Sequence, residues 1–362
     1  MAYSFVMTGG GTGGHVFPAL AVARVLRERG HKLLFIGTRA GMEARLVPEA
    51  GYEIEFVRTG SLKRVSVRQR LQTAWQLPLG IGAASGLLRR FGAQAVFSTG
   101  GYVAGPVMIA SILRRVPLIV MEPNAIPGFA NRRVGRRVYR ALVGFEQTRK
   151  WFPTGRSEVT GLPVRPEFFD VQPKRPGAFT VLITGGSRGA HTLNRAARES
   201  WPLVRAGNAP IRIVHQTGAA EHEELAREFA AAGLEGEVIP FIQNMPEAFA
   251  AADLIVGRAG AGAVNEIAAA GMASVLVPLP FAADDHQRRN AEAFVQAGAA
   301  RMVLDAEMNG DRLFREIDQL RRGPGELEQM RARVRQFAKP GAAERAADVL
   351  EEAASGGASR VP

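Results

Sequence analysis

The stretch Gly9-Gly10-Gly11-Thr12-Gly13-Gly14-His15 decides how the first part of this chain folds. An apolar run at residues 3–8 leads into it, and residues 16–26 follow it with the apolar periodicity of a helix. A strand, a glycine loop and a helix in this order direct unpaired backbone N–H groups and the positive helix end toward an anion. The stretch therefore predicts an anion-binding loop with a titratable histidine at its exit.

A dinucleotide site is the first alternative for this loop. Gly9, Gly11 and Gly14 have the spacing G-x-G-x-x-G, which alone is a weak indication. An NAD site also needs an acidic residue at the end of the second strand to bind the ribose. The second predicted strand, residues 32–37, is followed by Thr38-Arg39-Ala40, which contains no acid. Only an NADP site, with Arg39 as its phosphate ligand, survives as a minor alternative.

The same pattern recurs in the second half of the chain. Residues 179–184 predict a strand, 185–190 (Gly-Gly-Ser-Arg-Gly-Ala) a second glycine loop, and 191–199 a helix. Other predicted strands, separated mostly by helices, lie at 52–57, 95–99, 117–121, 141–144, 211–216, 238–241, 254–257, 274–278 and 301–304. Such alternation predicts an α/β fold class with two Rossmann-like, doubly wound domains.

The length of 362 residues is enough for two domains, each with its own core. Proline and glycine are dense at 161–177, as is typical of a linker. We expect a first domain at 1–162 and a second at 163–339. The helical pattern near the end of the chain predicts a helix at about 340–355 that packs back on the first domain.

The net charge of +12 is unevenly distributed. Residues 1–150 carry 22 Lys and Arg against 7 Asp and Glu, so all of the excess positive charge lies there. A strongly basic half is typical of proteins that bind nucleic acid or an anionic membrane surface.

The chain has no cysteine, which excludes disulfides and thiolate metal sites. It opens directly on a strand and has no apolar run of transmembrane length, so we expect a cytoplasmic protein.

The stretch from residue 62 to residue 90 allows two interpretations. It combines basic residues with Trp75 and several leucines; the basic residues are Lys63, Arg64, Arg68, Arg70, Arg89 and Arg90. Basic residues that flank an apolar helix bearing a tryptophan indicate an interfacial membrane patch. An ordinary helix packed on the sheet fits equally well.

The second half contains the denser group of polar residues. Residues 257–267 follow a predicted strand and open a helix, and we expect Glu266 in its first turn. An acid there stabilises the helix N-terminus, or accepts hydrogen bonds from two ribose hydroxyls. Residues 278–290 form a loop and helix start rich in side chains that bind hydroxyls.

At this point the chain resembles the MurG family of peptidoglycan N-acetylglucosaminyltransferases over nearly its whole length. The resemblance rests on residues 10–18, 100–103, 122–124, 163–165, 185–190, 265–268 and 285–290, taken together and in order. It implies the GT-B architecture, two Rossmann-like domains facing a cleft. It also implies inverting transfer of N-acetylglucosamine from UDP-N-acetylglucosamine to undecaprenyl-diphosphate-N-acetylmuramyl-pentapeptide (lipid I), giving lipid II, without metal or cofactor.

The resemblance also implies which residues contact the donor. They are Thr12, Gly13, Gly14, Asn124, Arg165, Ser187, Ile242 and Gln287, with Glu266 on the ribose and the turn Ala261, Gly262, Ala263, Val264 and Asn265 facing the nucleotide. The loop around Ser187 suits a diphosphate, and Arg165 offers a charged donor fork. The amides of Gln287 and Asn124 suit sugar hydroxyls.

The first glycine loop then becomes the acceptor side of the site, where it would meet the acceptor diphosphate. His15 is the candidate general base, and the helix N-terminus should keep it neutral. The alternative is that His15 hydrogen-bonds the sugar or stabilises the loop. The three histidines at 191, 215 and 222 are expected to be structural or exposed, and Asp284-Asp285 lacks the D-x-D spacing of a metal site.

The implied location is the cytoplasmic face of the inner membrane, with its anionic leaflet and other cell-wall synthesis proteins as partners and no nucleic acid. The chain departs from the family pattern at Met121, Pro123, Leu162, Arg188 and Ala259, which flank the implied donor residues. Two alternatives stay open: another GT-B enzyme, such as a UDP-sugar epimerase, and a non-catalytic nucleotide- or nucleic-acid-binding protein.

Overall fold

The computed structural model describes residues 1–362 except 12, 59–66, 173, 175, 208–209, 283–284 and 357–362, and side chains at 67–76 are also outside the description. The chain forms two compact units. The first contains Met1–Val164 and the segment that begins at Gly341, and the second contains Arg165–Pro340. Within the described residues, no helix is both long and apolar enough to cross a membrane.

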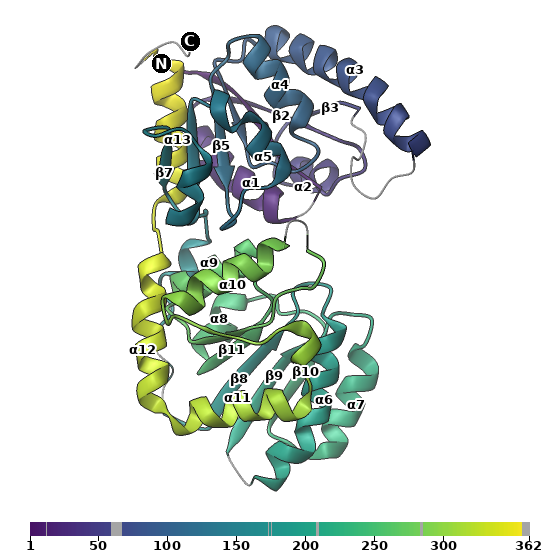
Figure 1. The fold of residues 1–362 in the computed structure, drawn as a ribbon, viewed down its shortest axis with the longest axis vertical. Helices are drawn as coiled ribbons and strands as arrows, with labels where there is room; N and C mark the ends of the chain where they lie inside the picture. Colours follow the sequence, from purple (N-terminus) through teal and green to yellow (C-terminus); the bar gives the residue numbers. More distant parts are fainter. Residues whose placement is uncertain are drawn as a thin grey trace. The chain divides into compact units, whose positions relative to one another are not determined.

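The first unit is built on a parallel sheet of seven strands in the order β3-β2-β1-β4-β5-β6-β7 (Figure 1). The strands are β1 (Ser4–Thr8), β2 (Lys32–Gly37), β3 (Ile54–Phe56), β4 (Ala95–Ser98), β5 (Leu118–Glu122), β6 (Arg140–Val143) and β7 (Ser157–Val159). The helices are α1 (Gly13–Glu28), α2 (Glu43–Glu49), α3 (Val67–Phe91), α4 (Gly105–Leu113), α5 (Phe129–Val134) and α13 (Ala342–Ala354), with 3-10 turns at Gly135–Arg137 and Glu146–Trp151.

The second unit has a parallel sheet of six strands in the order β10-β9-β8-β11-β12-β13. The strands are β8 (Phe179–Thr184), β9 (Ile211–Gln216), β10 (Gly236–Ile239), β11 (Leu254–Gly257), β12 (Ser274–Leu276) and β13 (Arg301–Met302). The helices are α6 (His191–Ala206), α7 (His222–Ala232), α8 (Met245–Ala250), α9 (Ala261–Ala270), α10 (His286–Gln296), α11 (Gly310–Arg322) and α12 (Pro324–Val334). Within the described residues, 3-10 turns also lie at Pro166–Phe168, Asp305–Glu307 and Arg335–Phe337.

Both sheets place a glycine loop at the point where the strand order reverses. In the first unit, β1 pairs with β2 on one side and β4 on the other; in the second, β8 pairs with β9 and β11. In open parallel sheets, ligands bind at this point, outside the carboxyl ends of the strands. The predicted α/β class with two Rossmann-like sheets is therefore confirmed, and each predicted loop lies at a binding position.

The strands are buried because helices cover both faces of each sheet, which is why they read as continuous apolar runs. Phe5, Val6, Phe97 and Ile183 have no exposed surface. The predicted strand at 301–304 shortens to Arg301–Met302, because its pairing with β12 spans only two residues. Strand β7 was not predicted, because three residues are too few to show a period.

The long helix α3 supports part of each interpretation of residues 62–90. Its second half packs into the core of the first unit through Ala84, Leu87 and Leu88, beside α4 (Figure 1). Leu79, by contrast, is 70% exposed. Lys63 and Arg64 and the side chains of Arg68, Arg70 and Trp75 lie outside the described residues.

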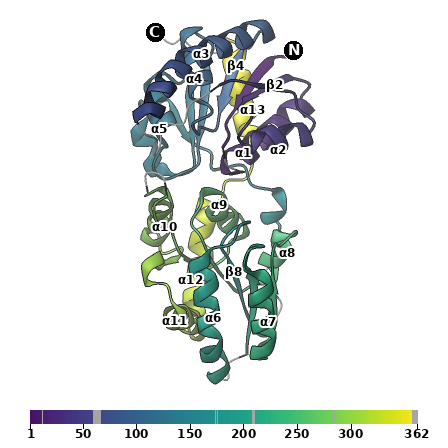
Figure 2. The same ribbon diagram turned by 90° about the vertical axis from the view of Figure 1, so that its right-hand side faces the viewer.

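Helix α13 returns to the first unit, where it packs on α1 and β4 (Figure 2). The Arg29 guanidinium lies 2.7 Å from Asp348 and 2.8 Å from Glu351. His31 Nδ1 accepts the Tyr3 N–H at 3.1 Å, so its Nε2 carries the proton that it donates to Glu351 at 2.6 Å. These contacts attach the last helix to the start of the first sheet.

Candidate functional site

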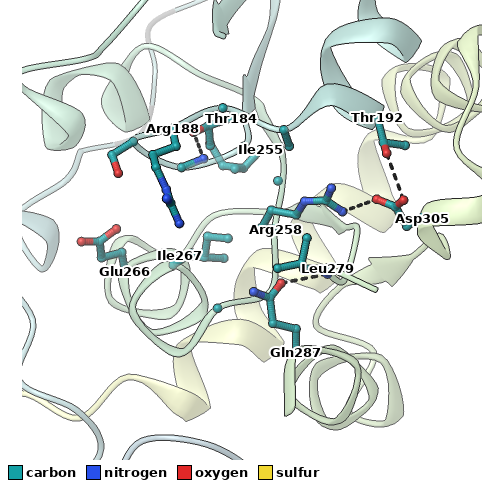
Figure 3. Close-up of a pocket in the computed structure, with 18 of the residues that line it drawn as sticks. Thr184, Arg188, Thr192, Ile255, Arg258, Glu266, Ile267, Leu279, Gln287 and Asp305 are labelled. Carbon is teal, nitrogen blue, oxygen red and sulfur yellow. Dashed lines mark hydrogen bonds and ion pairs between the residues drawn. The ribbon is translucent and has the colours of Figure 1, made fainter. Parts of the chain in front are cut away.

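The second unit contains a pocket of about 730 Å³ at the carboxyl ends of β8 and β11. It is lined by residues 184–192, by parts of 255–267, and by Met245, Phe249, Leu279, Pro280, Gln287 and Asp305. Figure 3 shows that Arg188 and Glu266 point into it from different loops and helices. The pocket is the site that the reversal of strand order predicts.

The second glycine loop forms one wall of this pocket. Gly186 and Gly189 have φ values of +85° and +74°, a region that favours glycine. A Cβ on Gly189 would lie 1.8 Å from the Thr217 carbonyl oxygen, so this position also lacks room for a side chain. Ser187 and Arg188 are exposed between the two glycines. The loop thus presents a hydroxyl and a guanidinium on a fixed backbone.

Gln216, the last residue of β9, is 1% exposed and hydrogen-bonds this loop. Its Nε2 donates to the Gly186 carbonyl at 2.8 Å and to Thr184 Oγ1 at 3.2 Å. Its Oε1 accepts the Ile242 N–H at 2.8 Å. One buried amide therefore joins the loop, the end of β8 and the segment after β10.

Glu266 lies in the second turn of α9, because the helix begins at Ala261 after the N-cap Gly260. The prediction that it lies in the first turn is therefore wrong, and so is the description of 261–265 as a turn, because these residues form the first helical turn. Partial burial raises the pKa of Glu266 to about 7, and the Arg165 charge opposes this shift. Within the described residues, no group hydrogen-bonds to its carboxyl, so its oxygens are available to a ligand that donates.

On the opposite wall, polar contacts fix the lining. Gln287 Oε1 accepts the Leu279 N–H at 2.9 Å, which leaves the Gln287 amide nitrogen as a donor (Figure 3). Arg258 forms an ion pair with Asp305, and Thr192 donates to the same carboxylate at 2.9 Å (Figure 3). The Asp305 carboxylate thus joins the residue after β11, helix α6 and its own 3-10 turn.

Of the residues implied as donor contacts, the structure brings Ser187, Ala263, Glu266 and Gln287 together around the pocket. Arg165 is close enough to Glu266 to lower its pKa, and its guanidinium lies 5.0 Å above the Phe168 ring. The others in this unit do not line the pocket; they are Ile242, Ala261, Gly262, Val264 and Asn265. Val264 is fully buried, and the Asn265 amide donates to the Ala261 carbonyl at 2.8 Å.

In the first unit, Gly13 and Gly14 begin α1, and His15 lies in its first turn and not on the loop itself. Thr12 lies outside the described residues. His15 Nδ1 lies 2.8 Å from the Thr99 carbonyl oxygen, and the Thr99 hydroxyl donates to the His15 carbonyl at 2.8 Å. Because a carbonyl oxygen only accepts, Nδ1 carries the proton, and Nε2 of the neutral ring is the basic nitrogen.

Asn124 belongs to a loop that a second buried glutamate organises. Glu122, 2% exposed, accepts the Asn124 N–H at 3.0 Å, the Asn124 amide at 3.1 Å, the Gly128 N–H at 2.9 Å and the Asn131 amide at 2.9 Å. Burial raises the pKa of Glu122, and these four donors oppose the shift. The Asn124 side chain is therefore fixed by Glu122.

The first glycine loop also differs from the simple anion cradle that was predicted. The Gly11 N–H donates to Glu43 Oε2 at 2.9 Å, so this amide already has an acceptor within the protein.

The sequence analysis did not identify the three side chains that support these loops, which are Glu43, Glu122 and Gln216. One feature of the sequence could have identified these residues. Each is an acid or an amide among apolar residues, close in sequence to a strand end or a glycine.

In the described part of the chain, acidic and histidine side chains form no cluster of three that could hold a metal ion. Asp284 lies outside the described residues.

Comparison with known proteins agrees with the architecture of both units. Residues 5–143 match the glycosyltransferase family 28 N-terminal domain, and residues 180–346 match the glycosyltransferase family 28 C-terminal domain. A "UDP-N-acetylglucosamine--N-acetylmuramyl-(pentapeptide) pyrophosphoryl-undecaprenol N-acetylglucosamine transferase" of Solibacter usitatus (strain Ellin6076) is 58% identical over 98% of this chain and 97% of its own. A protein of the same name from Halorhodospira halophila (strain DSM 244 / SL1) is 42% identical over 96% and 97%.

Among solved structures, MurG of Acinetobacter baumannii superposes with a TM-score of 0.82 at 32% sequence identity. The match covers 97% of this chain and 100% of that one. The two-unit α/β fold is therefore the GT-B fold.

The two positive-φ glycines of the second loop give a matched pair of substitutions. Gly186→Ala meets nothing within 4 Å and should cost only the backbone strain, about 1 kcal/mol of unfolding free energy. Gly189→Ala adds a clash with the Thr217 carbonyl and should lower the melting temperature further. Calorimetric melting measures both effects. Equal losses for the two variants would contradict this account of the loop.

Proposed function

The chain belongs to the family of UDP-N-acetylglucosamine--N-acetylmuramyl-(pentapeptide) pyrophosphoryl-undecaprenol N-acetylglucosamine transferases, and we propose that it transfers N-acetylglucosamine from UDP-N-acetylglucosamine to lipid I, forming lipid II. The observation that carries the proposal is the pocket of the second unit. It combines a glycine loop at a strand end with a partly buried glutamate to which no described group hydrogen-bonds. These features suit a nucleoside diphosphate sugar.

The donor would bind with its diphosphate on residues 185–190. The loop lies at the N-terminus of the 16-residue helix α6, whose positive end favours negative charge. Ser187 and Arg188 add a hydroxyl and a cation. Both can stabilise the negative charge that develops on the diphosphate as it leaves. Glu266 would accept the two ribose hydroxyls. Because the Ile242 N–H is bonded to Gln216, a contact with the nucleotide at that residue would use its carbonyl.

His15 would act as the general base. The Thr99 carbonyl holds Nδ1 protonated, so Nε2 can take the proton of the acceptor hydroxyl. That hydroxyl oxygen then forms a bond to the anomeric carbon while the bond from this carbon to the diphosphate oxygen breaks. Uridine diphosphate leaves with the electron pair, and a single displacement of this kind inverts the anomeric centre.

Transfer of labelled N-acetylglucosamine to a lipid I analogue tests the activity. The wild-type protein should give a lipid-linked disaccharide, and absence of product would contradict the proposed reaction. His15→Gln should lower kcat by about 100-fold or more with little change in KM for the donor, since it removes only the base. His222→Gln, on helix α7, is the matched control and should keep kcat. If His15→Gln instead keeps kcat and raises KM, His15 binds substrate and is not the base.

The raised pKa of Glu266 predicts how donor binding depends on pH. The ribose hydroxyls donate, so the donor binds the ionised carboxylate and lowers its pKa in the complex. The KM for UDP-N-acetylglucosamine should therefore fall as pH rises through about 7, with proton release on binding below that pH. Steady-state kinetics from pH 6 to 8 and calorimetry in two buffers measure these effects.

Glu266→Gln should raise KM and remove its pH dependence, whereas Glu223→Gln, at an exposed position on α7, should change neither. A KM that is flat across this range in the wild-type protein would contradict the role of Glu266.

We further propose that the first unit binds the cytoplasmic, anionic leaflet of the membrane that carries the acceptor. Two neighbouring helices support this proposal. Leu79 of α3 and Leu113 of α4 are each 70% exposed. Exposed arginines accompany them at positions 89, 90, 114 and 115. Exposed apolar side chains beside cations are typical of an interfacial membrane site.

Flotation with vesicles tests the membrane proposal. The protein should float with vesicles that contain anionic phosphatidylglycerol and much less with neutral phosphatidylcholine. Replacing both Arg89 and Arg90 with Gln should weaken anionic binding by about 30-fold, at about 1 kcal/mol for each charge. Replacing Arg195 and Arg198 of α6 with Gln is the control and should have no effect. Equal binding of the wild-type protein to both vesicle types would overturn the electrostatic part of the proposal.

A further inference from the structure

A buried carboxylate lies directly beneath the first glycine loop. Glu43 is the first residue of α2 and is 1% exposed. Its Oε2 accepts the Gly11 N–H at 2.9 Å. Its Oε1 accepts the Thr38 N–H at 3.0 Å and the Thr38 hydroxyl at 2.8 Å. Three donors of the protein thus converge on the two carboxyl oxygens of Glu43.

Glycines close the space around this carboxylate on three sides. A Cβ on Gly10 would lie 2.3 Å from Glu43 Oε2, and one on Gly41 would lie 2.1 Å from the same atom. A Cβ on Gly37 would lie 2.6 Å from Glu43 Cγ. Glycine at these positions therefore makes room for the carboxylate of the protein itself, in addition to allowing the loop to turn.

The second glycine loop has no such arrangement. Gln216 supports it by donating to a loop carbonyl, so the support adds no negative charge. In the first loop, Glu43 accepts from a loop N–H, a group that in other glycine loops can bind a phosphate. The two loops are alike in sequence, but among the described residues a buried carboxylate bonds the first and a neutral amide bonds the second.

The same loop is joined to His15 through β4. The Thr99 hydroxyl and carbonyl hold the His15 backbone and ring, as described above. A Cβ on Gly101 would lie 2.6 Å from the Gly10 carbonyl oxygen and 3.4 Å from His15 Cδ2, so the segment after β4 touches both loop and ring. The Gly11 bond to Glu43 fixes the loop from one side, and residues 99–101 fix it from the other.

We propose that Glu43 is an internal anion that fills the phosphate position at the base of the first loop, and that it positions His15 for proton transfer. The inference rests on the proposed role of His15 as base. It assigns the first loop to catalytic geometry and assigns phosphate binding through loop N–H groups to residues 185–190. Removing the carboxylate should therefore lower kcat and leave donor binding intact, because the donor pocket belongs to the other unit.

Glu43→Gln tests the proposal without a large change in shape. Its amide group brings N–H donors against the Gly11 and Thr38 donors, so the loop should shift. A misplacement of about 1 Å at a reacting group costs about 100-fold, so kcat should fall by about that factor. The Kd for uridine diphosphate should stay within about twofold of wild type. Glu49→Gln, on the exposed face of the same helix, is the matched control and should keep kcat.

A double substitution distinguishes positioning of His15 from a general effect on folding. If Glu43 acts through His15, then Glu43→Gln combined with His15→Gln should have the kcat of His15→Gln alone. Fully additive losses would overturn the proposal. If His15→Gln alone proves harmless while Glu43→Gln is not, the base assignment fails, and absence of product from wild-type protein would reject the transferase function instead.

Rescue by a small anion provides a second readout. Glu43→Ala leaves a glycine-walled space of carboxylate size, so sodium formate should restore kcat at least fivefold, and sodium chloride at equal ionic strength should not. Circular dichroism and uridine diphosphate binding establish that the variant is folded. If Glu43→Ala does not fold, Thr38→Val, which removes one of the three donors, should lower kcat with normal donor binding. Wild-type kcat in both Glu43→Gln and Thr38→Val would overturn the proposal.

Discussion

Backbone N–H groups that leave a parallel strand and enter a loop need acceptors, and the architecture of this protein depends on how they find them. In the described part of the chain, the buried side chains that bond such loops include two glutamates and one glutamine. Glu43 accepts from the first glycine loop, Glu122 accepts from the loop that carries Asn124, and Gln216 bonds the second glycine loop and Ile242. Each of these bonds holds part of a loop without a ligand, and such preorganisation lowers the entropy that binding must overcome.

The two glycine loops differ in the chemistry of the buried side chain that supports each of them. A neutral amide beneath residues 185–190 leaves the positive end of α6 free to attract a diphosphate. In the first loop, the Glu43 carboxylate already accepts the N–H of Gly11. Two loops with similar sequences can thus serve different substrates, because the difference lies in residues that neither loop contains.

Local patterns were enough to predict both sheets and both loops, because buried parallel strands are continuous apolar runs and tight turns need glycine. They were not enough to predict the side chains that support the loops. Glu43 is 32 residues from Gly11, and Gln216 is 30 residues from Gly186. Folding alone brings them together. The small residues after Gly260 were interpreted as a turn, although Gly260 caps a helix that begins at Ala261. That one-turn difference moves Glu266 away from the helix N-terminus.

The position of Glu266 explains why its carboxyl differs from the two structural glutamates. Glu43 and Glu122 accept several hydrogen bonds from the protein, which stabilises each of them where it lies. In the second turn of α9, Glu266 is beyond the unpaired N–H groups that would have satisfied it. It is partly buried without a described donor, which is why its pKa rises to about 7. A carboxyl without a donor among the described residues would gain most from a ligand with two adjacent hydroxyls, which supports the proposed contact of Glu266 with the ribose.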